Sequence, residues 1–274
     1  MTTNQVEKPA KPGKKVIILT ILLLIVAAWV IFLVQKNLNS PEKLLAKGQD
    51  YEFQGEYDQA LASYRKAAAL GSPEAHLELG QLLSRGLAGQ KDLAGAIEAY
   101  EKAAQAGLER AYFELGVLYL TGPKDLANPA LAAQRFQRAA DKNIVQAIFN
   151  LGVMNAAGLG LEQNYQKANQ YWAQAEAQDY QPARYFLAIS QATGWGVKQD
   201  PEKAFALAKR AAEAQWPQAQ YLLGLFYSNG WGVAQDHQQA QQWYQKAAQG
   251  GSHKLDLAMA IVDWDNSPIL SGQN

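Results

Sequence analysis

Three histidines and one pair of glutamates are the side chains of this chain that could do acid–base or metal chemistry. His76, His237 and His253 stand too far apart in the sequence to form a ligand pair on one helix. Glu74 and Glu78 are four residues apart, a spacing typical of the solvated face of a helix. The chain has no cysteine, which excludes thiol nucleophiles, disulfides and cysteine-bound metals. We therefore predict no catalytic residue and no metal site.

Two glycine pairs around a tryptophan could instead form a phosphate-binding loop. They are Gly194-Trp195-Gly196 and Gly230-Trp231-Gly232, and 36 residues separate them. A nucleotide loop of this kind follows a strand and opens a helix, whereas here an apolar pattern of helical spacing precedes each pair. The constant spacing favours a turn used repeatedly by a structural unit. We predict no cofactor.

The same 36-residue period holds five further landmarks in register. A Leu-Gly or Leu-Ala pair comes first, then a glycine, an Asp or Asn, an alanine and, in four of the five units, an aromatic residue. In the first complete unit these landmarks are Leu79-Gly80, Gly86, Asp92, Ala96 and Tyr100. The unit that contains Leu187-Ala188 departs from the pattern twice. It has Ala188 in place of the glycine and Ala208 in place of the aromatic residue. A repeat of this length is typical of a solenoid.

Each unit reads as two antiparallel helices. In the first complete unit, apolar residues at helical spacing predict a first helix over 75–85. Gly86 should end it in the left-handed conformation, and Asp92 should cap the start of the second helix. The unit that begins at Glu109 has the sequence GPKDLANP where the other units have the glycine loop, so its loop is expected to differ.

The pattern resembles the Sel-one-like repeat family, a branch of the tetratricopeptide superfamily. The resemblance is carried by AQYLLGLFYSNGWGVAQDHQQAQQWYQKAA, Ala219–Ala248, and covers residues 73–252 as five units. Residues 41–72 resemble an ordinary tetratricopeptide repeat, and residues 253–265 resemble one more first helix that caps the stack. We expect residues 266–274 to form a disordered tail. The resemblance implies an all-α fold, a right-handed α-solenoid of helix-turn-helix repeats.

The N-terminus has a different character. Residues 1–15 are polar and carry four lysines, 16–34 form an uncharged apolar run, and 35–40 are a short linker. As a helix the run would be about 28 Å long, close to the roughly 30 Å hydrocarbon thickness of a bilayer. We predict a single transmembrane signal-anchor, Val16–Val34, that contacts lipid, with a cleaved signal peptide as the alternative. The lysine bias favours a cytoplasmic N-terminus and a repeat domain outside the cytoplasm.

The resemblance also suggests where a partner would bind, since first helices line the inner side of such a solenoid. An apolar or aromatic residue recurs three positions before each Leu-Gly glycine or its Ala188 counterpart. We call this set the aromatic row: Leu77, Phe113, Phe149, Tyr185 and Tyr221. Further groove-facing candidates are Gln81, Arg85, Val117, Thr121, Gln146 and Asn229. Two interpretations of the row stay open, namely packing between neighbouring units and contact with a ligand.

The function predicted from these features is a membrane-anchored scaffold or adaptor that binds a protein or peptide in its groove. The 25 basic and 25 acidic residues leave no positive excess for nucleic acid. We place the protein in a bacterial inner membrane, with the repeats in the periplasm. The alternative is an envelope protein that binds glycan or peptidoglycan, and the third option is a hydrolase without a recognisable motif.

Overall fold

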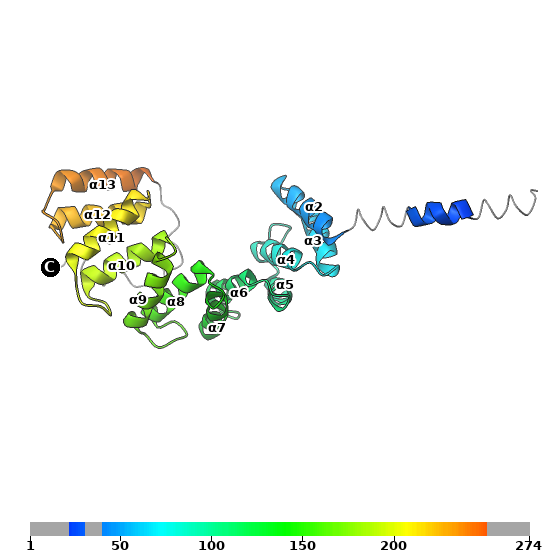
Figure 1. Ribbon diagram of the computed structural model, residues 1–274, viewed down its shortest axis with the longest axis horizontal. Helices are drawn as coiled ribbons and strands as arrows, with labels where there is room; N and C mark the ends of the chain where they lie inside the picture. Colours follow the sequence, from blue (N-terminus) through cyan, green and yellow to red (C-terminus); the bar gives the residue numbers. More distant parts are fainter. Residues whose placement is uncertain (1–21, 31–39, 251–274) are drawn as a thin grey trace, which may run out of the picture. The chain divides into compact units, whose positions relative to one another are not determined.

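The computed structural model describes residues 22–30 and 40–250 and is shown in Figure 1. Residues 22–30 are helical, and the rest of the described chain contains helices and no strand. The helices are α2 (Pro41–Phe53), α3 (Tyr57–Ala69), α4 (Pro73–Arg85), α5 (Leu93–Gln105), α6 (Arg110–Thr121), α7 (Pro129–Ala140), α8 (Val145–Ala157), α9 (Tyr165–Glu176), α10 (Gln181–Thr193), α11 (Pro201–Glu213), α12 (Pro217–Asn229) and α13 (His237–Gln249). The all-α solenoid is confirmed.

Several predictions fall wholly or partly outside the described residues. They concern the N-terminal tail, the ends of the apolar run 16–34, the capping helix 253–265 and the C-terminal tail 266–274. Within residues 22–30 and 40–250, no helix is both long enough and apolar enough to cross a bilayer.

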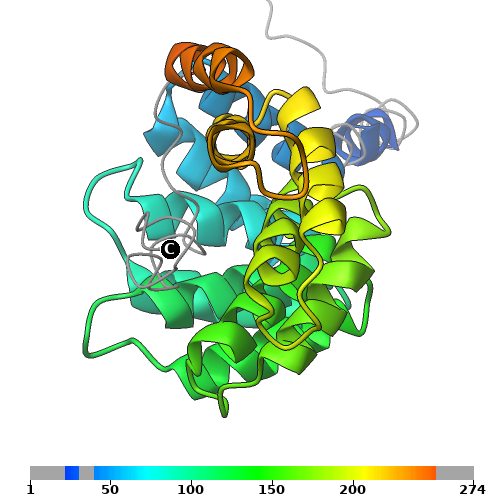
Figure 2. The ribbon, with the colours of Figure 1, turned by 90° about the vertical axis from the view of Figure 1, so that its left-hand side faces the viewer.

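The helices divide into two compact bodies, residues 1–99 and residues 100–274, called here the N-terminal and C-terminal bodies. In the N-terminal body α2 packs on α3 and α3 on α4. In the C-terminal body each helix from α6 to α13 packs on the next, so that helix pairs stack in sequence order. Figure 2 views this stack from the side where α12 and α13 lie. The even-numbered helices are the first helices of their units, and the odd-numbered helices are the second helices.

The predicted helix ends are confirmed in most units. First helices end at a left-handed glycine with φ between 69° and 79°, at Gly86, Gly158, Gly194 and Gly230. Helix α6 ends differently, at Gly122 with φ of −64°, in the unit whose loop sequence departs from the pattern, and α2 ends at Gln54 with φ of −80°. From α5 to α13 the second helices begin at an Asp or Asn side chain that accepts a backbone N–H three residues on, as Asp92 does from Gly95 at 2.8 Å, whereas α3 begins at Glu56 without such a bond.

The Leu-Gly glycine packs directly against an aromatic ring of the same unit and leaves no room for a side chain. A Cβ atom at Gly116, Gly152 or Gly224 would overlap the ring of Phe136, Trp172 or Tyr244, respectively. The one unit with Ala188 in place of this glycine has Ala208 in place of the ring, and both alanines are fully buried. The two departures seen in the sequence therefore compensate each other, because an alanine pair replaces a glycine–aromatic pair.

The second glycine of each Gly-x-Gly loop joins successive units. A Cβ at Gly160, Gly196 or Gly232 would overlap backbone atoms at the start of the second helix of the preceding unit. Beside Gly196, the carbonyl of Trp195 accepts a hydrogen bond from Asn169 Nδ2 at 2.7 Å, and its indole ring stacks on Tyr165 with the ring centroids 5.2 Å apart. The Gly-Trp-Gly sequence is thus an inter-unit contact, which confirms that it is a loop between helices.

The turn from one unit to the next also has a fixed form. One residue in each turn is left-handed, at positions 36 residues apart: Gly71, Gly107, Asn143, Asp179 and Gln215. In four of these turns the next residue donates its backbone N–H to a carbonyl five residues back, as Tyr180 does to Ala175 at 3.2 Å. This hydrogen bond is that of a Schellman motif and closes the second helix.

The two glycines of one loop provide a matched test of these roles. Gly194→Ala should cost about 1 kcal/mol, since it places a Cβ at φ of 79° with its nearest neighbour an ordinary 3.6 Å away. Gly196→Ala has the same left-handed strain and must also push two units apart, which adds about 1–3 kcal/mol. Unfolding midpoints followed by circular dichroism would measure both losses. Equal losses in the two variants would show that Gly196 is not an inter-unit contact.

Candidate functional site

The aromatic row lies mostly in the interior. The exposed fractions are 7% for Leu77 and 3% each for Phe149 and Tyr185, and Phe113 is half-buried. Only Tyr221 is exposed, at 49%. The row is therefore not a continuous surface strip, and most of its side chains are not placed to meet a ligand.

Phe149 and Tyr185, two buried members of the row, pack against residues at the start of the next unit. The Phe149 ring lies 5.3 Å from the rings of Tyr180 and Phe186, and the Tyr185 ring lies 4.9 Å from that of Trp216. Tyr180 and Trp216 each stand directly before the first helix of the next unit. This geometry agrees with the first of the two interpretations of the row, packing between neighbouring units.

The other groove-facing candidates share one side of the first helices. Residues 0, 4, 7 and 11 positions along a helix fall within about 60° of one direction. The positions of α6 on this side are Arg110, Glu114, Val117 and Thr121, and together with their equivalents in α8, α10 and α12 they are called the first-helix face. Gln146 and Asn229 belong to it and are exposed, as is Thr121, whereas Val117 is half-buried.

The first-helix face carries few charges towards the C-terminus. On α6 the charged residues Arg110 and Glu114 form an ion pair at 3.5 Å. Helices α8 and α12 contain no charged residue, and α10 contains Arg184 alone. The polar side chains of these three helices on this face are Gln146 and Asn229, which are exposed, and Asn150, Thr193 and Gln218, which are half-buried. Asn229 Nδ2 and Thr193 Oγ1 donate hydrogen bonds to carbonyls of their own helices, and Gln218 Oε1 is buried. Such groups donate and accept hydrogen bonds without a net charge.

The candidates of the N-terminal body lie around α4. Gln81 is half-buried, and Arg85 is exposed, with its guanidinium 4.0 Å from Glu52 Oε1. The other oxygen of Glu52 accepts a hydrogen bond from the Tyr64 hydroxyl at 2.8 Å. Burial, together with this hydrogen bond and the Glu52 charge, raises the pKa of Tyr64. These contacts of Glu52 with Tyr64 and Arg85 link α2, α3 and α4 to one another.

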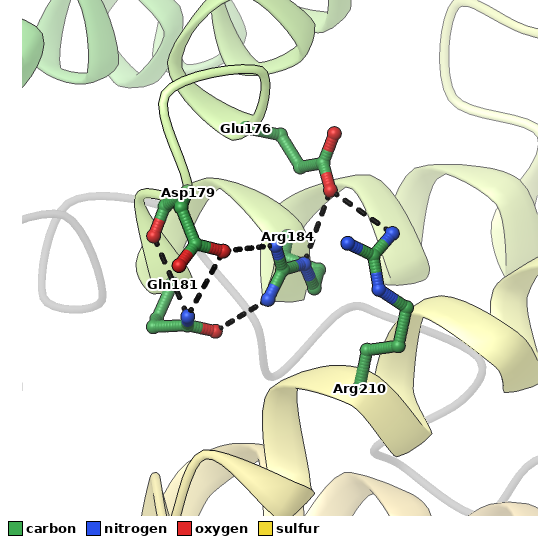
Figure 3. Close-up of polar contacts among 5 residues, drawn as sticks. All are labelled: Glu176, Asp179, Gln181, Arg184 and Arg210. Atoms are coloured by element: carbon green, nitrogen blue, oxygen red, sulfur yellow. Dashed lines mark hydrogen bonds and ion pairs between the residues drawn. The ribbon is translucent and has the colours of Figure 1, made fainter.

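The sequence analysis missed a polar cluster that is centred on one buried arginine, Arg184. Arg184, with a side chain 4% exposed, donates from Nε to Glu176 Oε1 at 3.1 Å, from Nη1 to Gln181 Oε1 at 2.7 Å and from Nη2 to Asp179 Oδ1 at 2.7 Å. Glu176 also pairs with Arg210 Nη1 at 3.2 Å. As Figure 3 shows, the cluster joins α9, the following turn, α10 and α11. The sequence signals for it are Arg184, at a position that other units fill with His76, Tyr112, Ile148 or Gln220, and Glu176, at a position that other units fill with alanine.

The cluster is satisfied internally and has the character of a structural joint. The Asp179 carboxyl accepts a hydrogen bond from Arg184, and this bond, together with the charge of the guanidinium, lowers the pKa of Asp179. All three guanidinium nitrogens of Arg184, Nε, Nη1 and Nη2, have partners within the cluster. Nowhere in residues 22–30 and 40–250 do three or more His, Cys, Asp or Glu side chains come together as a metal site.

Asp179→Asn tests the cluster, because asparagine already occupies the equivalent left-handed position at Asn143. A carboxyl whose pKa is lowered by folding stabilises the protein above its unfolded pKa of about 3.9, and loses this effect as the pH falls. The variant should therefore unfold at a lower urea concentration than the wild type at pH 7, and the gap should close below about pH 4. Asp125→Asn, in the exposed loop after α6, is the control. A gap that does not change with pH would contradict the assignment.

Comparison with known proteins places this geometry in a family. The family model described as Sel1 repeat matches residues 44–72, 73–108, 109–144, 145–180, 181–215 and 217–252. The matches include the stretch that we compared with an ordinary tetratricopeptide repeat, so the model counts six units where we expected five. No curated protein matches the sequence.

Solved structures similar to the chain include two Sel1-type proteins. One is a protective antigen of uropathogenic Escherichia coli with an SLR fold, at 26% identity and a TM-score of 0.72, over 79% of this chain and 47% of the antigen. The chain thus spans about half the length of that relative. The other is a Sel1 repeat protein from Oxalobacter formigenes, at 28% identity and a TM-score of 0.68, over 76% of this chain and 85% of that protein. With six matched units over most of its length, the chain belongs to the Sel1 repeat family.

Proposed function

We propose that this protein is a membrane-anchored adaptor that holds an extended segment of another protein on its first-helix face, outside the cytoplasm. Sel1 repeats form a fold typical of protein–protein interaction. The observation that carries the proposal is the neutral, amide-bearing surface of α8 and α12, because side-chain amides can pair with the N–H and C=O groups of an extended backbone.

The chemistry of this face supports a polypeptide rather than a charged ligand. The single charged residue of α8, α10 and α12 is Arg184, which is buried and fully engaged by its own cluster. A phosphate-bearing or strongly acidic partner would be expected to meet accessible arginines or lysines. A partner bound through amide groups should dissociate little when salt is added, because neutral hydrogen bonds are not screened.

The membrane part of the proposal rests on the sequence. Residues 16–34 carry no charge over 19 positions, and the lysines before them favour a cytoplasmic N-terminus. The short linker 35–40 would then hold the repeats close to the bilayer. Such a tether confines partner binding to the membrane surface, which is the use of an anchored adaptor.

The absence of cysteine from the sequence allows a direct test of topology. Two single-cysteine variants, Thr3→Cys in the N-terminal tail and Gln170→Cys on the exposed side of α9, would be expressed as full-length protein. A membrane-impermeant maleimide added to spheroplasts should label Cys at 170 and should label Cys at 3 only after lysis. Labelling of position 3 alone in intact spheroplasts would reverse the orientation. Release of the protein from membranes by carbonate would show that the apolar run is no anchor.

A second test locates the partner on the repeats. A photoreactive phenylalanine analogue at Gln146, on the first-helix face, should form a discrete crosslinked product in cells. The same analogue at Gln170, equally exposed but on a second helix, should form none. When isolated membranes are irradiated instead, the yield of the product at 146 should stay the same as the ionic strength during irradiation rises from about 0.1 M to about 1 M, although the Debye length falls from about 10 Å to about 3 Å.

Other outcomes of this test would favour the competing functions. Crosslinking at Gln170 but not at Gln146 would move the partner to the second helices and overturn the proposed face. No crosslink at either position, combined with retention of the protein on purified cell-wall sacculi, would favour glycan binding.

A further inference from the structure

A polar cleft lies between the loop after α10 and the Gly-x-Gly loop of the next unit. Its volume is about 580 Å³, which is within the range found for sites that hold small ligands. The lining includes Gln191, Lys198, Gln199, Asp200, Glu202 and Gly232. Most of these side chains are polar, so a ligand here would be held by hydrogen bonds and charge.

The amide of Gln191 is the group in this cleft that the fold itself does not use. Gln191 is 8% exposed, and within residues 22–30 and 40–250 its side chain makes no hydrogen bond. The hydroxyl of the neighbouring Ser190 is sealed in the interior, whereas the Gln191 amide remains accessible from the cleft. A largely buried amide without a protein partner lowers stability, and a group that bonds to it from the cleft would remove this penalty.

This free amide belongs to one unit and not to the repeat as such. Asn155 stands at the equivalent position one unit earlier, and its Nδ2 donates to the carbonyl of Leu151 at 2.7 Å. Glu202 also departs from its equivalents. In the other four 36-residue units its position is filled by Ala94, Ala130, Gln166 and Gln238. The free amide and the added carboxylate therefore occur together at this cleft, apart from the architecture that the units share.

The charged groups that line the cleft are two carboxylates and one ammonium group. Asp200 Oδ1 accepts the backbone N–H of Lys203 at 3.0 Å as the cap of α11, and this bond does not involve Oδ2. Glu202 and Lys198 form no ion pair within the described part of the chain. With one net negative charge and more acceptors than donors, the lining suits a cation that offers several N–H groups.

The protein shows elsewhere how such a set of groups binds a cation. The Arg184 guanidinium is held by two carboxylates and one glutamine oxygen, as Figure 3 shows. The cleft offers the same three kinds of acceptor, at Asp200, Glu202 and Gln191, and none of its lining residues is an arginine.

We propose that this cleft binds a guanidinium group from outside the chain, with Asp200, Glu202 and the Gln191 oxygen accepting its N–H groups. The same chemistry is offered by an arginine side chain of a polypeptide and by a small guanidine compound. Residue 191 lies about 170° around α10 from the first-helix face, so this site is separate from the one proposed above. Binding in the cleft should weaken as salt is added, because it depends on charge.

A ligand-observed NMR titration of the detergent-solubilised full-length protein tests the site with three probes. N-acetyl-arginine amide represents a residue within a polypeptide, free L-arginine represents a small molecule, and N-acetyl-citrulline amide keeps the shape without the charge. The tighter of the two arginine probes should bind at least about tenfold better than the citrulline probe, and which one is tighter identifies the source. Equal affinity for the arginine and citrulline probes would overturn the proposal.

Two variants locate the binding. Glu202→Gln and Gln191→Leu should each weaken the tighter arginine probe about tenfold, whereas Glu213→Gln, at the other end of α11, should leave its affinity unchanged. Leu83 occupies the position of Gln191 in the first complete unit. The leucine variant should therefore fold, with an unfolding midpoint no lower than that of the wild type, because the unpartnered amide is gone.

The outcome for Glu202→Gln decides the proposal independently of the leucine variant, because Glu202 is exposed and its replacement does not disturb the core. Unchanged affinity in Glu202→Gln would overturn the proposed site, and so would an equal loss in Glu213→Gln. None of these measurements requires the polypeptide of the first-helix face, so failure here leaves the proposed function standing.

Discussion

The contact on which the described stack depends is the one between the second glycine of a Gly-x-Gly loop and the backbone of the unit before it. Hydrogen at Gly196 leaves just enough room for the start of α9, where any Cβ would overlap backbone atoms. Backbone cannot move aside as a flexible side chain can. The contact therefore sets the distance between units, and the buried aromatic rings, the Asn169 hydrogen bond and the Arg184 cluster are all arranged at that distance.

Much of the fold could be predicted from the repeat pattern because its landmarks have local causes. A left-handed glycine ends a helix and an Asp or Asn side chain begins one, whatever lies around them. Gly86, Gly194 and Asp92 behave accordingly. Gly122 could be set apart for the same reason, since its unit lacks the loop sequence that the other units share.

The candidate site was harder to predict because exposure depends on neighbours rather than on period. The sequence places Phe149, Tyr185 and Tyr221 at equivalent positions, yet the first two are 3% exposed and the third is 49% exposed. What differs is whether side chains of a further described unit cover the ring, and a single repeat motif does not contain that information. The Arg184 cluster escaped prediction because its members come from three helices and a turn. Two of its members depart from the pattern of their positions, namely Arg184 and Glu176, which stands where the other units have alanine.

The coupling of Ala188 to Ala208 has a consequence for how such a chain can change in evolution. Within one unit, the residue at the glycine position and the residue at the ring position must change together, because a ring and a Cβ cannot share the space. Between units, the turns at Asn143, Asp179 and Gln215 have the same left-handed form. Recombination at these turns preserves every pair, whereas recombination inside a unit separates the two halves of a pair. The 36-residue unit is therefore the natural length for duplication or loss, except at the turn of Asp179, where the Arg184 cluster joins two neighbouring units and would have to change with them.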